Sequence, residues 1–526
     1  MAVLTAPFAA DRGDEIALID ADGSTTWREL DLRVNRIVNA LRDRGLVVGD
    51  TVALIAGNRR EWFEIALACS HGGWTYVPVN WHWVADELAY VFEDAGPKAV
   101  LVDQRYADQV AIALADKRSA GVQLVVGIDD EAAFEPMQHD QRFVALEAML
   151  AAACDTEPTQ QRMGGPMFYT SGTTGRPKGV RGSLSGSADL GPEIMQLIAA
   201  GFGRFLPIPG RTLLCGPVYH SAQWAFSFLP MVAGSSVVMQ HRYDSAEALR
   251  LIDKHAVTNV HLVPTQMKRL VDLPADVKAA FSGSSLITVW HGAAPCPPAV
   301  KRSLIEWWGL KVTEYYGSTE GSVISTVDSE NWLAKGGSVG KPLDMFDVIV
   351  VGDDDQPVAP GVPGTLYFRN RMGMDFSYHN DENKTAAAHL EPGVFTTGDV
   401  GYLDEDGFLW LSDRKIDMII SGGVNIYPAE IEGVLSSHPA VADVAVIGVP
   451  NDEFGENVKG IVHLNAGYDV SDALVADLIA HCRLLLAGYK APKSIDFVSS
   501  IPRTGTGKIQ KQPLREPYWA GLTRRV

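Results

Sequence analysis

The segment with the clearest chemical signal runs from Tyr169 to Gly179 and reads YTSGTTGRPKG. Its glycines allow backbone N–H groups to approach an anion, while its hydroxyls and its lysine add donors and positive charge. A Walker loop, GxxxxGK[ST], is not matched because Arg-Pro precedes Lys178 and glycine follows it. The segment therefore predicts a polyphosphate-binding loop of a different type, formed by Thr170, Ser171, Gly172, Thr173, Thr174, Gly175 and Lys178.

Five short segments farther along the chain combine small residues with polar or charged side chains. They read HGAAP (291–295), YYGSTEG (315–321), TTGD (396–399), DRKIDMIISGGVNIYPAEIE (413–432) and PRTGTGKIQK (502–511). The small residues of the first two would let a flat purine lie between the backbone and Tyr316. Asp399 follows a glycine in a strand-to-turn context, where one carboxylate accepts hydrogen bonds from two ribose hydroxyls.

Taken in order, the six segments resemble the adenylate-forming superfamily of acyl-CoA synthetases, luciferases and peptide-synthetase adenylation domains. Within it, YVPVNWHWVADELAYVFEDAG (76–96) is similar to bacterial medium- and long-chain fatty-acyl-CoA synthetases. The resemblance implies a ligase that joins a hydrophobic carboxylic acid, preferably a fatty acid, to the α-phosphate of ATP and releases pyrophosphate. Coenzyme A then displaces AMP. ATP, Mg²⁺ and coenzyme A are the cofactors and co-substrates that it implies.

The resemblance also implies roles for single residues. ATP would be bound by the loop named above and by Gly292, Ala293, Ala294, Tyr316, Gly317, Ser318, Thr319, Asp399 and Arg414. The catalytic residues would be Thr319, Glu320 and Lys508. Glu320 would hold Mg²⁺, a hard cation that prefers oxygen ligands, and Lys508 would bring positive charge to the reacting oxygens. The acyl pocket would include His220 and Trp224, and the coenzyme A channel would include Gly422, Gly423 and Asn425.

Simpler interpretations stay open for several of these residues. The pair 319–320 suits the first turn of a helix, 422–425 suits a β-turn, and Lys508 alone resembles an ordinary exposed lysine. His220 and Trp224 would look the same from sequence as core side chains.

One position departs from the family pattern. The family commonly places Asp or Lys two residues beyond the arginine matched here by Arg414, but this chain has Ile416. We therefore expect a hinge within 413–417, with its pivot open between Lys415, Asp417 and the backbone.

These segments need a scaffold, and the hydrophobic pattern indicates its class. Apolar residues recur at helical spacing from Trp27 to Gly45, and the strand-like TVALIA (51–56) follows at once. The alternation continues through KAVLVD (98–103) and QLVVGI (123–128), which is typical of parallel sheets in α/β proteins. From about Gly337 to Trp410, short runs between Gly and Pro predict a β subdomain.

We therefore expect an α/β fold with two domains. Residues 1–413 would form a large N-terminal part of layered α/β subdomains plus the β subdomain. Residues 414–526 would form a small α+β lid domain. Because the phosphate loop and Lys508 lie on different domains, the reaction would require closure of the lid.

Composition excludes several other classes of protein. With 45 basic and 64 acidic residues the net charge is −19, so we expect no nucleic-acid partner. No uncharged apolar run approaches the roughly 18–20 residues of a membrane span, and no secretory leader or paired-cysteine motif is apparent. We expect a cytoplasmic protein without an integral membrane segment, whose partners are a small carboxylic acid, ATP and coenzyme A. A homodimer is left open.

Two rival functions need comparison. One is an acyl- or aryl-acid adenylating enzyme that loads a carrier protein, and the other is a non-catalytic sensor of a nucleotide or an acyl ligand. Amino-acid-activating members usually carry an aspartate near the pocket, whereas PVYHSAQW (217–224) has no carboxylate. A sensor is disfavoured because it would have no need of Lys508.

Overall fold

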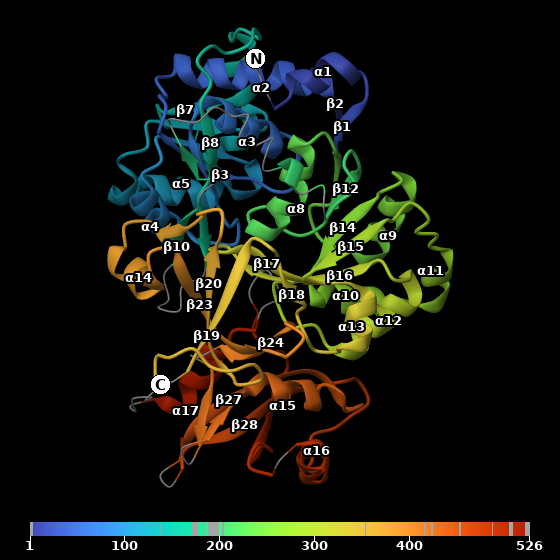
Figure 1. The fold of residues 1–526 in the computed structure, drawn as a ribbon. Coiled ribbons are helices and arrows are strands. Elements are labelled where there is room, and N and C mark those ends of the chain that lie inside the picture. The colour runs from blue at the N-terminus through green and yellow to red at the C-terminus, as the bar shows by residue number, and fades with distance from the viewer. Residues whose placement is uncertain are drawn as a thin grey trace. The chain divides into compact units, whose positions relative to one another are not determined.

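The computed structural model of the chain describes residues 4–137, 139–170, 177–182, 185–187, 199–201, 203, 205–352, 354–414, 417–421, 424–451, 454–486, 488–503 and 509–520. Figure 1 shows the helices and strands. The chain forms two compact units. Unit 1 contains residues 1–262, 272–290 and 374–387, and unit 2 contains residues 263–271, 291–373 and 388–526.

A seven-stranded sheet of unit 1 has the order β11-β8-β4-β3-β5-β6-β7, and the strands from β8 to β7 pair in parallel. Its strands are β3 (Thr51–Ile55), β4 (Thr75–Pro78), β5 (Ala99–Val102), β6 (Leu124–Gly127), β7 (Phe143–Ala145), β8 (Met163–Pro166) and β11 (Gly186–Ser187). Its helices are α2 (Trp27–Asp43), α3 (Arg60–Gly72), α4 (Ala85–Ala95), α5 (Ala107–Ala115) and α6 (Leu146–Ala151), with 3₁₀ turns η1 (Gln104–Tyr106), η2 (Lys117–Ser119) and η3 (Glu131–Met137).

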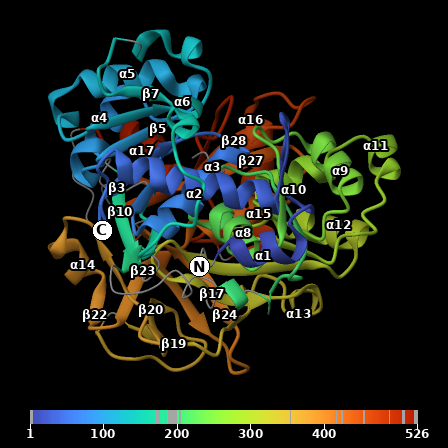
Figure 2. The same ribbon diagram turned by 90° about the horizontal axis from the view of Figure 1, so that it is seen from above.

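Helices cover both faces of this sheet, and its central strands β3, β5 and β6 are buried at every position. Val52 and Leu54 of β3 join a core cluster with α2 and α3, and Ala53 and Ile55 join another with α4 and α5 (Figure 2). Fully buried parallel strands of this kind are typical of α/β proteins. The predicted helix that begins at Trp27 is confirmed, and a capping box of the Thr26 and Glu29 side chains starts it.

Further strands of unit 1 lie consecutively in a second sheet in the order β14-β12-β13-β1-β2. They are β1 (Ile16–Asp20), β2 (Gly23–Thr26), β12 (Arg211–Leu214), β13 (Ser236–Met239) and β14 (Asn259–Leu262), and β15 (Thr288–His291) follows in the chain. A small antiparallel sheet contains β9 (Phe168–Thr170), β10 (Lys178–Gly182) and β21 (Phe376–Tyr378). The remaining helices of unit 1 are α1 (Ala6–Arg12), α8 (Ser221–Val232), α9 (Ser245–Lys254), α11 (Ala275–Ala280) and α14 (Glu382–Ala387).

Unit 2 begins with antiparallel strands β16 (Val312–Ser318), β17 (Ser322–Val327) and β18 (Lys341–Pro342), and with helices α10 (Pro264–Val271), α12 (Pro298–Trp308) and α13 (Ser329–Ala334). An antiparallel sheet follows, formed by β19 (Phe346–Val351), β20 (Gly364–Asn370), β22 (His389–Glu391), β23 (Val394–Leu403) and β24 (Leu409–Arg414). This sheet confirms the predicted change to short strands after Gly337.

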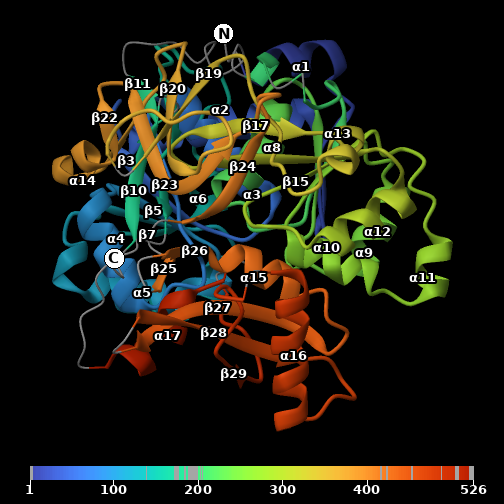
Figure 3. The same cartoon turned by 60° about the horizontal axis from the view of Figure 1, so that its bottom comes forward.

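The C-terminal part of unit 2 combines strands and helices in an α+β arrangement. Its strands are β25 (Ile419–Ser421), β26 (Val424–Ile426), β27 (Val441–Asn451), β28 (Gly455–Leu464) and β29 (Ser494–Phe497), and its helices are α15 (Pro428–Leu435), α16 (Asp472–Leu485) and α17 (Lys511–Trp519). Val444 and Val446 of β27 pack in a cluster with α15 and α16, whereas Ala445 and Ile447 pack toward α17 (Figure 3). The α/β fold class is confirmed, and a domain boundary at 413/414 stays a prediction.

Among the helices that the structure describes, none combines the length and the apolar character that crossing a membrane requires.

Candidate active site

The predicted phosphate loop begins and ends in a β-hairpin of unit 1. β9 and β10 pair antiparallel, and Thr170 lies opposite Lys178. The Lys178 ammonium lies 5.3 Å from the centre of the Tyr378 ring on β21. The predicted contacts Ser171, Gly172, Thr173, Thr174 and Gly175 lie outside the described residues. The structure therefore fixes the two ends of the segment at adjacent strand positions.

The base of this hairpin is anchored by side chains that the sequence analysis did not identify. The Tyr169 hydroxyl donates to the Asp94 carboxylate at 2.5 Å, and His379 Nε2 lies 3.0 Å from the Asp94 carbonyl oxygen. Burial and this carboxylate raise the pKa of Tyr169 well above its usual value. A Cβ atom at Gly179 would lie 3.1 Å from both the His379 side chain and the Tyr169 ring, so the glycine allows close packing. No local pattern around Asp94 predicts a partner 75 residues away.

In unit 2, the segment HGAAP adopts a constrained backbone. A Cβ atom at Gly292 would lie 2.5 Å from the Tyr315 ring and 2.8 Å from the Tyr315 carbonyl oxygen, so only glycine fits. Ala293 has φ +68°, in the left-handed region that non-glycine residues seldom occupy. Such a conformation costs on the order of 1–3 kcal/mol and persists only where the surroundings impose it. The path of the backbone at residues 292–294 is therefore set by packing against Tyr315.

The segment YYGSTEG forms the end of β16 and the turn into β17. The register shifts between Tyr316 and Gly317, and a Cβ atom at Gly317 would collide with the carbonyl oxygen of Ser322. The Gly321 N–H donates to the Ser318 hydroxyl at 2.9 Å, which closes the turn. Thr319 and Glu320, both partly exposed, lie in this turn. The helix N-terminus that served as the simpler interpretation of this pair is therefore wrong.

Two predicted nucleoside contacts meet in unit 2. The Tyr316 hydroxyl donates to the Asp399 carboxylate at 2.6 Å, and the Thr397 hydroxyl donates to the same oxygen at 2.7 Å. Asp399 lies on β23 directly after Gly398, whose φ of +78° suits glycine. The Tyr316 ring packs 5.9 Å from the Phe368 ring of β20. An aromatic ring and an oriented carboxylate are the groups that a purine nucleoside needs for stacking and for its ribose hydroxyls.

Arg414 is the last residue of β24, and its backbone lies opposite Asp399 in the antiparallel pair. Its side chain lies outside the described part of the chain, as do Gly422, Gly423, Lys508 and the side chain of Asn425. Arg503 and Ile509 form an isolated antiparallel bridge around the predicted lysine segment, and Gln510 N–H donates to the Pro502 carbonyl at 2.8 Å. The described ends of this segment therefore lie side by side.

His220 and Trp224 begin helix α8 of unit 1, in different environments. Within the described residues His220 Nε2 is buried without a hydrogen-bond partner, and burial lowers the pKa of the imidazole to about 3. His220 is therefore neutral at pH 7. Trp224 is 3% exposed, stacks on Phe228 at 5.2 Å, and donates its indole N–H to the Tyr76 hydroxyl at 2.8 Å. These contacts make Trp224 a core side chain of the unit, and a role in the acyl pocket stays a prediction.

An aromatic cluster around Trp81 lies next to His220 and was not identified from sequence. The Trp81 ring is stacked on Tyr106 at 6.0 Å, meets Tyr219 edge-on at 4.6 Å, and lies 5.5 Å from His241. The Tyr219 ring lies 4.3 Å from the His220 ring. Among described residues, the Tyr219 hydroxyl and His241 Nδ1 are buried without partners. The polar atoms of Tyr219, His220 and His241 therefore lie in an aromatic cluster around the Trp81 ring.

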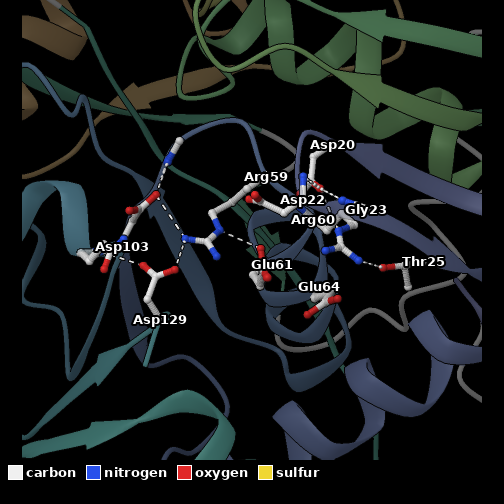
Figure 4. A network of polar contacts seen from close by, with 12 residues as sticks. Asp20, Asp22, Gly23, Thr25, Arg59, Arg60, Glu61, Glu64, Asp103 and Asp129 are labelled. Carbon is white, nitrogen blue, oxygen red and sulfur yellow. Dashed lines mark hydrogen bonds and ion pairs between the residues drawn. The ribbon is translucent and has the colours of Figure 1, made fainter. Parts of the chain in front are cut away.

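A polar network follows β3 at the carboxyl edge of the parallel sheet (Figure 4). Arg59 forms ion pairs with Glu61 at 2.7 Å and Asp129 at 2.8 Å, and lies 3.4 Å from the Asp103 carboxylate. Arg60 pairs with Asp20 at 3.1 Å. Because each of these arginines has carboxylate partners, the network holds the loops after β3, β5 and β6 together.

Within the described residues, no group of three or more His, Cys, Asp or Glu side chains is arranged to hold a metal ion by itself. A cation shared between Glu320 and a bound polyphosphate would need only one protein carboxylate.

Comparison with known proteins gives consistent matches along the chain. Residues 6–376 match the AMP-binding enzyme family, and residues 430–508 match the AMP-binding enzyme C-terminal domain. The chain is 33% identical over 502 residues to a feruloyl-CoA synthase of an Amycolatopsis species, covering 94% of both chains. It is 30% identical over 519 residues to the medium/long-chain-fatty-acid–CoA ligase FadD8 of Mycobacterium tuberculosis, covering 96% of this chain and 88% of that one. The solved structure of ATP-bound MatB from Rhodopseudomonas palustris is similar with a TM-score of 0.82 at 29% identity, covering 99% of this chain and 100% of that one.

Proposed function

The chain belongs to the AMP-binding enzyme family and is an AMP-forming acid–thiol ligase, and from this premise we propose that it activates a hydrophobic carboxylic acid, preferably a fatty acid, with ATP and transfers the acyl group to coenzyme A. The observation that carries the proposal is the 2.6 Å contact between Tyr316 and Asp399. It brings together two motifs 83 residues apart, as a single nucleoside site formed by both would require.

In this proposal the adenine ring lies between the Tyr316 ring and the constrained backbone of Gly292, Ala293 and Ala294. Asp399 accepts hydrogen bonds from the ribose hydroxyls, and its carboxylate is already oriented by the Tyr316 and Thr397 hydroxyls. Arg414 contributes from the neighbouring strand. A pocket whose polar groups are held before binding loses little conformational entropy when the ligand arrives.

The phosphates are assigned to the loop between β9 and β10 and to the turn after Tyr316. Gly317, Ser318 and Thr319 bind the α-phosphate, and the partly exposed Glu320 would hold Mg²⁺, which usually takes only one or two protein carboxylates. Bound Mg²⁺ would neutralise phosphate charge. Lys508 brings positive charge to the attacking carboxylate and the α-phosphate, where repulsion between two anions is strongest.

Residues 414–526 are proposed to act as a lid that presents Lys508 during adenylation. The same lid presents Gly422, Gly423 and Asn425 to the pantetheine arm during thioester formation. The hinge lies within 413–417. The described part of this segment offers one polar candidate, Asp417, whose carboxylate pairs with Arg515 of α17 at 2.5 Å.

The acid is proposed to enter beside His220. A neutral imidazole can donate one hydrogen bond to a carboxylate but cannot act as an acid near pH 7, so His220 is a pocket residue and not an acid–base catalyst. The two relatives described above are named for an aryl acid and for medium- and long-chain fatty acids. Both kinds of acid therefore belong in the test. A cytoplasmic location and a homodimer remain predictions.

The experiment is product analysis with a panel of acids. The purified protein is given Mg-ATP, coenzyme A and one acid at a time, from hexanoate to palmitate together with ferulate and indoleacetate. We expect AMP, pyrophosphate and an acyl-CoA, with the highest kcat/KM for a fatty acid. ADP as the product would refute adenylation, a preference for ferulate would refute the fatty-acid assignment, and transfer only to a carrier protein would refute the coenzyme A step.

A further inference from the structure

A buried ion pair lies directly behind the proposed nucleoside site in unit 2. Lys301 on α12 is 0% exposed, and its ammonium lies 2.6 Å from the carboxylate of Glu314 on β16, whose side chain is 11% exposed. The ammonium also lies 4.6 Å from the centre of the Trp332 ring. Neither residue belongs to the six segments singled out in the sequence.

Stability alone gives no reason for charges at this place. Burial lowers the pKa of Lys301 and raises the pKa of Glu314, which means that burial disfavours both charged forms. Two apolar side chains of similar volume would fill the same space, and such replacements of buried ion pairs are often neutral or stabilising. A role of the two charges is therefore expected in the contacts that Glu314 and Lys301 make with neighbouring segments.

The Glu314 carboxylate contacts residues on both sides of the HGAAP segment. His291 Nε2, at the first residue of that segment, lies 3.7 Å from it. Lys301, in the first turns of the helix that follows the segment, lies 2.6 Å from it. One carboxylate thus lies close to the first residue of the segment and pairs with the helix that follows it, with the left-handed Ala293 between these two positions in the chain.

Glu314 also lies two residues before Tyr316 on the same strand, so the two side chains leave β16 on the same side. Between them, Tyr315 points to the other side and packs its ring against Gly292. Three consecutive residues of β16 therefore contact the HGAAP segment or form the proposed nucleoside site. A shift of Glu314 would therefore change the position of the Tyr316 ring relative to the HGAAP backbone.

We propose that Lys301 and Glu314 are positioning residues for the nucleotide, which set the spacing between the HGAAP backbone and the Tyr316 ring. The inference rests on the proposed function, because it takes the space between these two elements as the adenine site. The pair does not contact the ligand itself. Its role is to hold the two walls of the site at the distance that a purine ring requires.

The test compares stability with nucleotide affinity. In Lys301→Met/Glu314→Leu both charges are replaced by apolar side chains, so the variant should melt within a few degrees of the wild type, whereas either single change leaves an unpaired buried charge and should melt lower. We expect the double variant to bind AMP about tenfold more weakly by calorimetry, which corresponds to about 1.4 kcal/mol. Its KM for ATP should rise to a similar extent, with the KM for the acid changed less than twofold.

A control is the Arg33–Glu64 pair in unit 1, in which the Arg33 side chain is 25% exposed and also pairs with Glu147. Its atoms lie 2.8 Å apart, and the Glu64 side chain is 3% exposed. Arg33→Met/Glu64→Leu should leave AMP affinity unchanged. If the Lys301 and Glu314 double variant does not fold, Glu314→Gln serves instead, because it keeps an acceptor for Lys301 while removing the charge, and AMP binding should weaken about threefold.

Outcomes separate this inference from the proposed function. A well-folded double variant with wild-type AMP affinity would show that the pair is only structural and would overturn the inference. Equal weakening in the Arg33 and Glu64 control would overturn it as well. A wild type that binds AMP but makes no acyl-CoA from any acid would refute the proposed function, while the comparison of AMP affinities would still decide the role of the pair.

Discussion

Replacing Asp399 by Asn should separate ribose recognition from every other contact of ATP. In the structure, one carboxylate oxygen accepts from the Tyr316 and Thr397 hydroxyls at 2.6 and 2.7 Å. An amide of the same shape loses the charge, and if its NH₂ faces these two hydroxyls it also loses an acceptor. Hydrogen bonds to charged groups contribute about 1.5–3 kcal/mol each, against about 1 kcal/mol for neutral ones. The difference of about 0.5–2 kcal/mol for each bond gives a loss of about 1–4 kcal/mol for two ribose hydroxyls, and we take about 2–3 kcal/mol as the central expectation.

That free energy corresponds to a roughly 30- to 150-fold rise in the Kd for AMP. The assay is calorimetric titration of the wild type and Asp399→Asn with AMP, 2′-deoxy-AMP and 3′-deoxy-AMP. The wild type should lose affinity for each deoxy nucleotide because a hydroxyl that paired with the carboxylate is missing. The variant should distinguish the three nucleotides by less than about threefold, since the partner of those hydroxyls is already impaired.

Tyr316→Phe is the companion variant. It removes the 2.6 Å bond to Asp399 but leaves the ring and the bond from Thr397, so AMP should bind about threefold to tenfold more weakly while the preference for ribose over deoxyribose persists. If Asp399→Asn still distinguished AMP from the deoxy nucleotides as well as the wild type does, the assignment of the carboxylate to the ribose would be refuted, even if overall affinity fell.

Four other predictions follow from the same geometry. Glu320→Gln should lower the rate of ATP–pyrophosphate exchange by roughly 10² without a change in melting temperature, and normal exchange would exclude it as the Mg²⁺ ligand. Lys508→Ala should slow adenylation by roughly two to three decades but barely slow attack of coenzyme A on synthetic acyl-AMP, and equal damage to both steps would contradict a lid that presents Lys508 only for adenylation. The pKa of His220 in the folded protein is about 3, below the usual 6.5, so the folded state keeps this imidazole neutral. Its contribution to folding stability is therefore present above pH 6.5 and is lost as the pH falls from 6.5 toward 3. His220→Gln should flatten the profile of melting temperature against pH in that window and leave it unchanged above pH 7. Tyr169→Phe should raise the KM for ATP several-fold by releasing the hairpin from Asp94, and an unchanged KM would show that the anchor has no influence on phosphate binding.

Local sequence rules predicted the parts of the fold that are determined locally. The helix beginning at Trp27 could be found because apolar residues recur at helical spacing up to Gly45, and the buried strand after Asp50 could be found because its residues are mostly apolar. The β subdomain after Gly337 was visible from its turn residues. In each case the signal for an element lies within that element or in the turns that flank it.

Contacts between distant segments could not be predicted in this way. Asp94 is separated from Tyr169 by 75 residues, and nothing near it marks it as an anchor. Lys301 lies in an amphipathic helix where a lysine normally faces solvent, and only its burial against Glu314 reveals another role. The ordered motifs predicted the groups that are proposed to contact ligands, because that chemistry restricts residue type directly. Positioning residues need only the right shape and charge in three dimensions.

The proposed nucleoside site combines several features that are costly to stability. Ala293 occupies a left-handed conformation, Gly317 interrupts a strand pairing, and Lys301 and Glu314 are charges removed from water. Each feature is explained if the two walls of the site must keep one separation in the absence of ligand. A preformed site of this kind saves ordering entropy when ATP binds, and that binding energy is then available for bringing the carboxylate against the α-phosphate.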